Sequence, residues 1–347
     1  MLTTNLKQLA IAFKGEAKKS STYKRIQRFF KKEFNLLGIG LFCLDQYLSE
    51  ISKINTVRKI YLIIDRVHWK VGRYNHNCLT LLLYDPVLGL DFPVAFMNLG
   101  HAGNSNVKMR KELIEPILTK IRPFIDDGKI EVTILGDREF TGAEWEAYLD
   151  TMPVNYVIRL KRDYKLEDGR SLKDVFKEVR EGRVKELQGE CYRIIITRLK
   201  RIRGRRDNFL AVMTVDMESS MREILNEYKI RWRIERAFFN LNSNGFNCKA
   251  TRLEKAARVE MLMYLLLLGY FLSTVVGILM ERLAEQPVKK HSYKAISIFL
   301  YGLRTLLILQ KHGPNDEILR KLLNFIDEEF LIVFNLLNLQ NKMKTVL

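Results

Sequence analysis

The chain has 347 residues, enough for one large or two modest domains with a substantial core. It carries 58 lysines and arginines against 40 aspartates and glutamates, a net charge of +18. That surplus favours a polyanionic partner, nucleic acid before an anionic membrane. The four cysteines form no CxxC pair, which argues against a zinc site or a disulfide framework and fits a reducing cytoplasm.

Residues 1–55 are predicted to be helical. The stretch STYKRIQRFFKKEF begins with residues that cap helices and then places apolar residues at helical spacing, with basic residues between them. We expect this basic region to contact DNA. The same pattern also fits a solvated amphipathic helix.

Residues 56–150 alternate between strand-like and helix-like segments, which predicts a mixed α/β sheet. RKIYLIIDRVHWK holds an apolar run that ends at Asp65, and IEVTILGD is a second run that ends at Asp137. Runs this apolar are expected of central strands buried on both faces. Their final carboxylates would emerge at strand ends, where α/β folds build their sites.

Residues 151–215 are predicted to form a β-rich insertion. RIIITRLKRIRGRRDNFLAVMTV reads as two strands around a basic turn at Gly204. The cations of this turn are candidates for binding phosphates, although a solvated charged hairpin would have the same sequence. They are Arg198, Lys200, Arg201, Arg203, Arg205 and Arg206.

Helices are expected at about 217–242, 252–283, 292–311 and 315–340, the last two within a helical C-terminal region. The span 261–280 has 20 residues without a charge, which is long enough to cross a bilayer. A helix buried in a large core is the favoured alternative. The span is single, and it directly follows a helix rich in polar groups.

The stretch YKIRWRIERAFFNLN, residues 228–242, gathers charge and aromatic surface. At 100° per residue, Tyr228, Arg231 and Glu235 fall within one narrow arc. Trp232 and Phe239 extend that face. The aliphatic residues lie opposite, at Ile230, Ile234, Ala237 and Leu241. We expect the aliphatic stripe to pack and the other face to be presented, although a salt-bridged surface helix would tolerate the pattern.

Three carboxylates, Asp65, Asp137 and Glu235, are candidates for a shared site. Three such groups can hold two divalent cations, and hard oxygen ligands suit magnesium or manganese. Two metals can activate the attacking oxygen and stabilise the leaving oxygen of a phosphodiester. That chemistry needs no histidine or cysteine cluster, and the sequence offers none.

The chain resembles the DDE transposases of bacterial insertion sequences, in the insertion-sequence-four-like group. The hallmark of that group is the YREK signature: Tyr, two residues, Arg, three residues, Glu, six residues, Lys. Tyr228, Arg231 and Glu235 match it in type and spacing, whereas Asn242 stands at the Lys position. Asp65 in LIIDRVHWK and Asp137 in ILGDREF match the first two acids. NLGHAGNSN, YVIRLK and LNSNGFNCKATRL also resemble the family, and the likeness covers about residues 20–285.

The resemblance implies a ribonuclease-H-like catalytic domain, residues 56–150 and 216–290, interrupted by the β-rich insertion 151–215. Residues 1–55 and 291–347 would be flanking helical regions. The implied cofactor is Mg²⁺, with Mn²⁺ as a substitute, bound by Asp65, Asp137 and Glu235. Water would attack at the transposon end, and the released 3′-hydroxyl would attack target DNA.

The resemblance also implies the partners: the terminal inverted repeats, target DNA, and a second copy of the chain on paired ends. No membrane partner is expected, and the place of action would be the bacterial cytoplasm, at the nucleoid. Tyr228 and Arg231 would grip phosphates near the transposon end, beside Asn242. Arg138 would neutralise a phosphate or pair with an acid. Trp232 or Trp145 would stack on an extruded base.

Asn242 supports an alternative reading. It keeps a hydrogen-bond donor but lacks the charge of lysine, which favours a catalytically weakened or inactive DNA-binding relative of the same fold.

Overall fold

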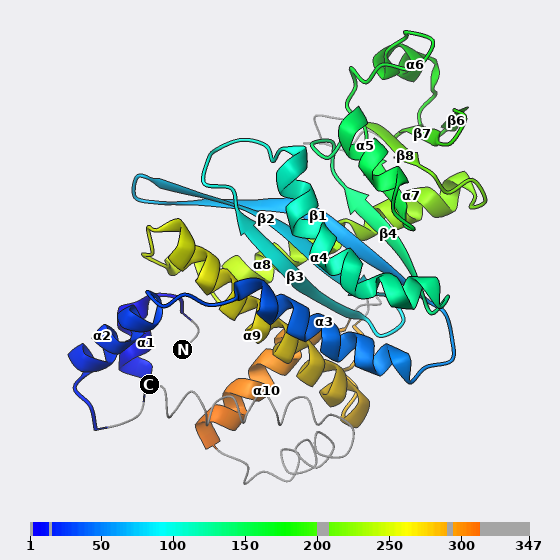
Figure 1. The fold of residues 1–347 in the computed structure, drawn as a ribbon. Helices are drawn as coiled ribbons and strands as arrows, with labels where there is room; N and C mark the ends of the chain where they lie inside the picture. The colour runs from blue at the N-terminus through cyan, green and yellow to red at the C-terminus, as the bar shows by residue number, and fades with distance from the viewer. Residues whose placement is uncertain (1–2, 14–15, 200–207, 290–293, 313–347) are drawn as a thin grey trace.

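The computed structural model describes residues 3–13, 16–199, 208–289 and 294–312, and over these residues one mixed sheet of eight strands runs through the protein (Figure 1). The strand order is β3-β2-β1-β4-β5-β8-β7-β6. The strands are β1 (Arg58–Val71), β2 (Tyr74–Asp85), β3 (Leu90–Asn98), β4 (Ile130–Gly136), β5 (Asn155–Arg159), β6 (Val184–Gln188), β7 (Arg193–Arg198) and β8 (Phe209–Thr214).

The sheet is parallel only at its centre. β1 pairs in parallel with β4, and β4 with β5, whereas every other neighbouring pair is antiparallel. The predicted mixed α/β class is therefore confirmed. The range predicted as an insertion, residues 151–215, supplies β5 to β8, and these strands extend the same sheet as β1 and β4.

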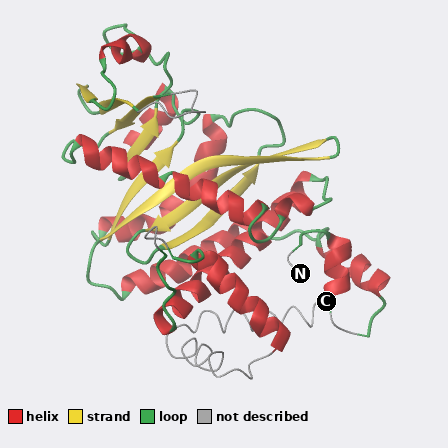
Figure 2. Cartoon of the chain, turned by 180° about the vertical axis from the view of Figure 1, so that it is seen from behind, coloured by secondary structure: helices red, strands yellow, loops and turns green. Residues whose placement is uncertain are grey.

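The helices are α1 (Leu6–Ala12), α2 (Lys19–Phe29), α3 (Leu36–Ser52), α4 (Val107–Asp126), α5 (Ala143–Asp150), α6 (Leu172–Glu178), α7 (Met221–Ile230), α8 (Trp232–Asn242), α9 (Ala256–Leu283) and α10 (Ile298–His312), with a short 3₁₀ turn η1 (Cys248–Ala250). α4 crosses the face of the sheet seen in Figure 1, and α8 lies behind it; Figure 2 shows the reverse view. The predicted helix at 315–340 lies outside the described residues.

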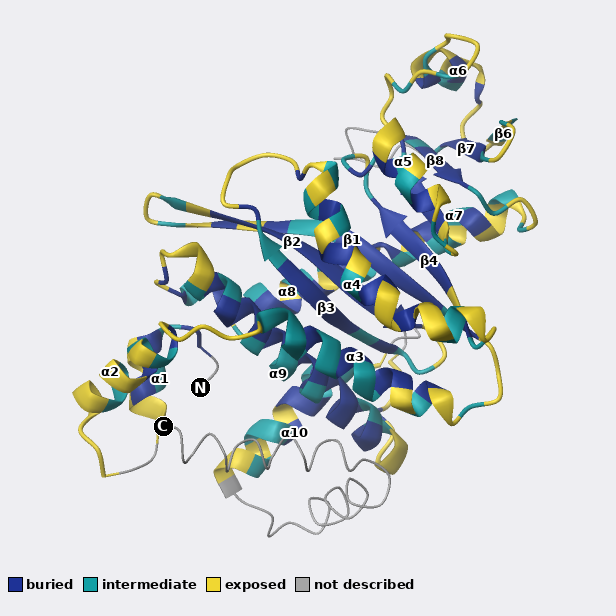
Figure 3. Cartoon of the chain, in the orientation of Figure 1, coloured by how far each residue is buried: buried dark blue, intermediate teal, exposed yellow. Residues whose placement is uncertain are grey.

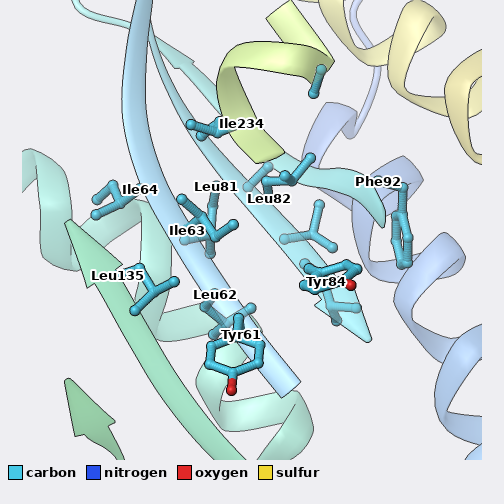
Figure 4. Close-up of a cluster of buried hydrophobic side chains, with 14 of the residues drawn as sticks. Tyr61, Leu62, Ile63, Ile64, Leu81, Leu82, Tyr84, Phe92, Leu135 and Ile234 are labelled. Atoms are coloured by element: carbon cyan, nitrogen blue, oxygen red, sulfur yellow. The ribbon is translucent and has the colours of Figure 1, made fainter. Parts of the chain in front are cut away.

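The core of the protein lies along β1. Residues 60–64 of this strand are buried on both faces, as the apolar run predicts. Figure 4 shows Ile63 among Leu81 of β2, Leu135 of β4 and Ile234 of α8. Figure 3 shows the same central strands as buried. Burying this much aliphatic surface on both faces fixes the strand order that sets up the site.

β1 does not end at Asp65, as the apolar run suggested, but continues to Val71. Its parallel pairing with β4 stops at Ile64, whereas its antiparallel pairing with β2 runs on to Val71 and Tyr74. Alternating burial replaces the continuous apolar run at this point, because the later residues have one partner strand and one packed face.

The uncharged span 261–280 lies within α9, which packs against β3, α3 and α10. α9 is the one described helix that is long and apolar enough to cross a bilayer, and 72% of its most apolar 18-residue window is buried inside the protein. Within the described residues, α9 therefore serves as a core helix.

We predict that alanine at Gly277 or Gly302 destabilises the protein. A Cβ at Gly302 would lie 1.8 Å from the Ser273 carbonyl oxygen, and one at Gly277 would lie 2.0 Å from the Ile298 carbonyl oxygen. α9 and α10 would have to separate, at a cost of roughly 2–3 kcal/mol in the free energy of unfolding. Gly269→Ala is the control on α9, because its Cβ would meet only the Phe246 ring, at 3.1 Å. Equal urea midpoints for all three variants would contradict this packing.

Candidate active site

Asp65 and Asp137 lie side by side on adjacent parallel strands. Ile64 pairs with Gly136 in the β1–β4 register, so the next residue on each strand is an aspartate. Neighbouring strands are about 4.8 Å apart, which places two carboxylates at one point of the sheet. The peptide N–H of Arg66 donates to Asp65 at 2.8 Å, and that of Arg138 donates to Asp137 at 2.7 Å.

The Asp65 carboxylate is in an unfavourable place for a charge. Its pKa is raised to about 6, mainly by burial; the Arg66 N–H and Arg231 oppose this rise, while Asp137 and Glu139 add to it. These effects together disfavour the ionised form of Asp65 in the folded protein, mainly because burial removes water from the carboxylate. A cation nearby would relieve that cost.

The segment 217–242 is not one helix. α7 ends at Ile230 and α8 begins at Trp232, with Arg231 at the junction, where its N–H bonds to the Tyr228 carbonyl at 3.1 Å in a tightened turn. α7 itself begins later than expected, at Met221, behind a capping box of Ser220 and Glu223. Arg231 nevertheless keeps helical dihedral angles, so only this one residue interrupts the two helices.

Tyr228 lies beside Arg231, as the wheel predicted, but it is not presented to solvent. It was expected on the presented face, but its side chain is 6% exposed. Arg231 is equally buried, at 7% exposed, and its guanidinium carbon lies 6.0 Å from the centre of the Tyr228 ring, so the two side chains face the protein together. Burial raises the Tyr228 pKa to about 12, so the phenol keeps its proton and remains a hydrogen-bond donor at neutral pH.

Arg231 joins the first and third carboxylates. One guanidinium nitrogen, Nη1, lies 2.9 Å from Asp65 Oδ2, and the other, Nη2, lies 2.9 Å from Glu235 Oε1. The Arg231 side chain is 8% exposed, whereas that of Glu235 is 42% exposed. The fork of the guanidinium suits this double contact, which a lysine could not make.

The rest of α8 is oriented as the sequence predicted. Ile234, Ala237 and Leu241 are buried, and Trp232 and Phe239 are more than half exposed. Two hydrogen bonds also anchor α8: Arg233 Nη2 donates to the Tyr84 hydroxyl at 3.0 Å, and Asn240 Nδ2 donates to the Tyr270 hydroxyl at 3.2 Å. Apolar burial and these bonds together fix which residues of α8 face the carboxylates.

A second group around the site was not foreseen. Arg66 donates from Nε to both carboxylate oxygens of Glu139 at 2.7 Å. It also donates to the Gly103 carbonyl at 2.6 Å and to Asn104 Oδ1 at 3.0 Å. The loop NLGHAGNSN is thereby tied to the strand that carries Asp65. A signal was present, since Arg66 directly follows one site aspartate and Glu139 lies two residues after the other.

Arg159 also belongs to the site. It closes β5, the strand YVIR, and its Nη1 lies 4.0 Å from Asp137 Oδ1, while its Nη2 donates to the Phe209 carbonyl at 3.2 Å. Its place follows from the parallel pairing of β5 with β4, which puts the end of β5 next to Asp137. The sequence of this strand resembles the family, but it predicted no role for Arg159.

The other predicted residues are dispersed. Arg138 is exposed beside Asp137, and Asn242 is half-buried at the end of α8. Trp145 is fully buried, because α5 packs it into the core, so its ring cannot stack on an extruded base. Trp232 is 54% exposed, and its ring is accessible. The basic turn with Arg203, Arg205 and Arg206 lies outside the described residues.

Comparison with known proteins gives the chain its family. The sequence pattern of the family described as "Transposase DDE domain" matches residues 61–272, more than half of the chain. The chain belongs to this family. The matched range begins in β1 and ends in α9, so it includes every carboxylate of the site. No curated protein sequence matches the chain.

Solved structures similar to this transposase domain are distant. A piggyBac transposase synaptic complex with hairpin DNA is 12% identical with a TM-score of 0.41, over 77% of this chain and 56% of that one. Human ENDOV is 11% identical with a TM-score of 0.27, over 66% of this chain and 97% of that one. An Argonaute from Marinitoga piezophila is 15% identical with a TM-score of 0.26, over 53% and 27% of the two chains.

The sheet of the DDE domain has the ribonuclease-H-like arrangement that the resemblance implied. Three antiparallel strands in the order β3-β2-β1 are followed by the parallel strands β4 and β5. The fold assignment rests on this topology together with the family match. The chain spans just over half the length of the piggyBac transposase chain.

The site has the oxygen donors that a divalent cation prefers, but they are not gathered around one point. Asp65 and Asp137 are neighbours, whereas Glu235 is bonded to Arg231. Across the described ranges, no three carboxylate, histidine or cysteine side chains are close enough together to hold a metal ion. The donor set fits magnesium in type, and the position between Asp65 and Glu235 is taken by the Arg231 guanidinium.

We predict that Asp65 makes stability depend on pH. Because its folded pKa is about 6 and its ordinary value is 3.8, the folded state binds the proton more tightly. Stability from this group is therefore present below pH 4 and is lost as the pH rises through 6. Relative to Asp65→Asn, the wild-type free energy of unfolding should gain about 2 kcal/mol between pH 7.5 and 4.5. Urea titrations across this range measure the difference, and a constant difference would refute it.

Proposed function

We propose that this protein is the metal-dependent DNA transposase of an insertion sequence, of the insertion-sequence-four-like group with the YREK signature. It would cleave phosphodiester bonds at the transposon ends and join the freed 3′-hydroxyl to target DNA. The observation that carries the proposal is that Asp65 and Asp137 are neighbours on two parallel strands, with Glu235 linked to Asp65 through Arg231.

In the proposed reaction, Asp65, Asp137 and Glu235 hold the cations. Bound Mg²⁺, or Mn²⁺ in its place, supplies activation of the attacking oxygen and stabilisation of the leaving oxygen. The raised pKa of Asp65 supports this role, because a buried carboxylate near two other acids gains from a neighbouring cation.

The residues around the carboxylates would place the DNA strand. Arg231 and Arg159 offer guanidinium donors on either side of the aspartates, and Tyr228 offers a hydroxyl that keeps its proton. Arginine binds phosphate oxygens through two parallel donors, which sets the orientation of a phosphate as well as its position. Trp232, exposed at the start of α8, would offer a ring for stacking against a base.

The proposed partners are the terminal inverted repeats of the element and target DNA, bound by a homodimer on paired ends in the bacterial cytoplasm, at the nucleoid. Residues 1–55 and the basic turn of the 151–215 insertion would add DNA contacts outside the catalytic region. The surplus of lysine and arginine supports a partner with many phosphates.

We predict that Asp65→Asn, Asp137→Asn and Glu235→Gln each lower cleavage by roughly 10⁴-fold, because each removes a charge on which the chemistry depends. The substrate is a labelled duplex of the DNA that borders the reading frame, in Mg²⁺ or Mn²⁺. Binding of the same duplex should change less than about threefold, since the phosphate contacts remain.

Arg122→Ala, an exposed cation on α4, is the control for that assay and should cut like the wild type. Variants of the three acids that cut normally would refute the site. A wild-type protein that binds the ends and never cuts would instead support the second candidate, a DNA-binding relative without catalysis, which Asn242 in place of lysine favours.

We predict that Asn242→Lys strengthens end binding through one more phosphate contact. The slope of log affinity against log salt should steepen by about 0.9. Asn226→Lys adds the same charge to an exposed position on α7 and is the matched control. Equal slopes for the two variants would show that position 242 does not face the DNA.

A further inference from the structure

The first two strands extend far beyond the sheet as a two-stranded ribbon, which we define as residues 66–77. β1 and β2 pair with each other up to Val71 and Tyr74. Pairing with β4 stops at Ile64, and pairing with β3 starts only at Cys78. The ribbon therefore projects beyond the end of the sheet, as both ribbon views show (Figures 1 and 2).

The two faces of the ribbon differ. Val67 and Trp69 are buried on the inner face, where the Trp69 ring lies 5.3 Å from that of His76. His76 Nε2 in turn lies 3.1 Å from the Leu253 carbonyl oxygen, a contact that holds the ribbon on the segment before α9. His68 and Lys70 are exposed on the outer face. The ribbon is thus anchored on its inner face. Its outer face is open toward the turn, whereas at the base Asn77 is buried and donates to the carbonyls of His101 and Gly103.

The open side carries positive charge that no neighbouring carboxylate neutralises among the described residues. Lys70 is exposed on the outer face and Arg73 is exposed at the turn, after Gly72 with a φ of +57°. Among the described residues neither cation has an ion-pair partner; the Arg73 guanidinium lies over the neighbouring Tyr74 ring. From residue 66 to residue 84 the sequence contains no aspartate or glutamate.

Charge on a projecting ribbon has an ordinary purpose, since it keeps open strand edges from pairing with other chains. That purpose is met by charges of either sign, or by both. A ribbon with cations and no carboxylates is selective for an anionic partner, and the width of a two-stranded ribbon fits the major groove of duplex DNA.

We propose that the ribbon is a DNA-binding arm that contacts the duplex away from the catalytic carboxylates. This inference rests on the proposed function, because it uses the same DNA. The arm starts at Asp65, and seven residues of strand reach about 23 Å to the turn. At 3.4 Å per base pair, the Lys70 and Arg73 side chains would meet phosphates about five to seven base pairs from the bond that is cut.

The test compares the full-length wild type with Lys70→Ala/Arg73→Ala on a duplex of the DNA that borders the reading frame. The double variant should lower the slope of log affinity against log salt by about 1.8, the loss of two phosphate contacts. Hydroxyl-radical protection should disappear about five to seven base pairs from the cut and persist at the cut itself. Lys70→Arg/Arg73→Lys keeps both charges and should restore the slope and the protection.

Lys53→Ala/Arg122→Ala is the matched control. It also removes two exposed cations. Lys53 follows α3 and Arg122 is on α4, close to where β1 and β4 begin, whereas Asp65 and Asp137 lie further along those segments. Its slope and footprint should equal those of the wild type. Circular dichroism of each variant reports whether the fold is retained.

The outcomes separate the two proposals. If the wild type binds and cuts the duplex but the ribbon variant has an unchanged slope and footprint, the arm is refuted and the proposed function stands. If the wild type neither binds nor cuts, both are refuted. A ribbon variant that alters sedimentation of the protein alone, with an unchanged slope, would assign the ribbon to contact between copies and overturn DNA binding.

Discussion

The site depends on one guanidinium. Arg231 lies between a partly buried aspartate on the central strand and a half-exposed glutamate on α8, and it donates to both at 2.9 Å. Without a cation there, Asp65 would face Asp137 and Glu139 in a buried place that already raises its pKa. The positive charge that links Asp65 and Glu235 is therefore supplied by a side chain of the protein itself, Arg231.

That guanidinium lies at the junction between α7 and α8, where Arg231 keeps helical dihedral angles. Tyr228 and Arg231 remain neighbours across the junction, with the Arg231 guanidinium carbon 6.0 Å from the centre of the Tyr228 ring, and both residues are buried. Each helix also buries an apolar side, Ile224 on α7 and Ile234 on α8. Apolar burial of the two helices therefore holds Arg231 and Tyr228 against the protein rather than toward solvent.

β1 unites the separate parts of the molecule. Its first half is buried core, its middle carries Asp65, and its last part becomes the exposed ribbon. Arg66, the next residue along, ties the β3–α4 loop and Glu139 to the same point. A single strand thus links stability, the proposed chemistry and the proposed DNA contact, so substitutions along it should separate these properties by position.

The sequence by itself determined the mixed α/β class, the apolar strands that hold the two aspartates, the buried α9 and the aliphatic stripe of α8. Each of these depends on the order of apolar and polar residues within one segment, which a sequence displays directly. Only the tertiary structure decided that β1 continues past Asp65, that the helix breaks at Arg231, that Tyr228 is buried, and that Arg66, Glu139 and Arg159 lie around the aspartates. These features depend on pairing between segments distant in the chain, and no local pattern encodes the partner.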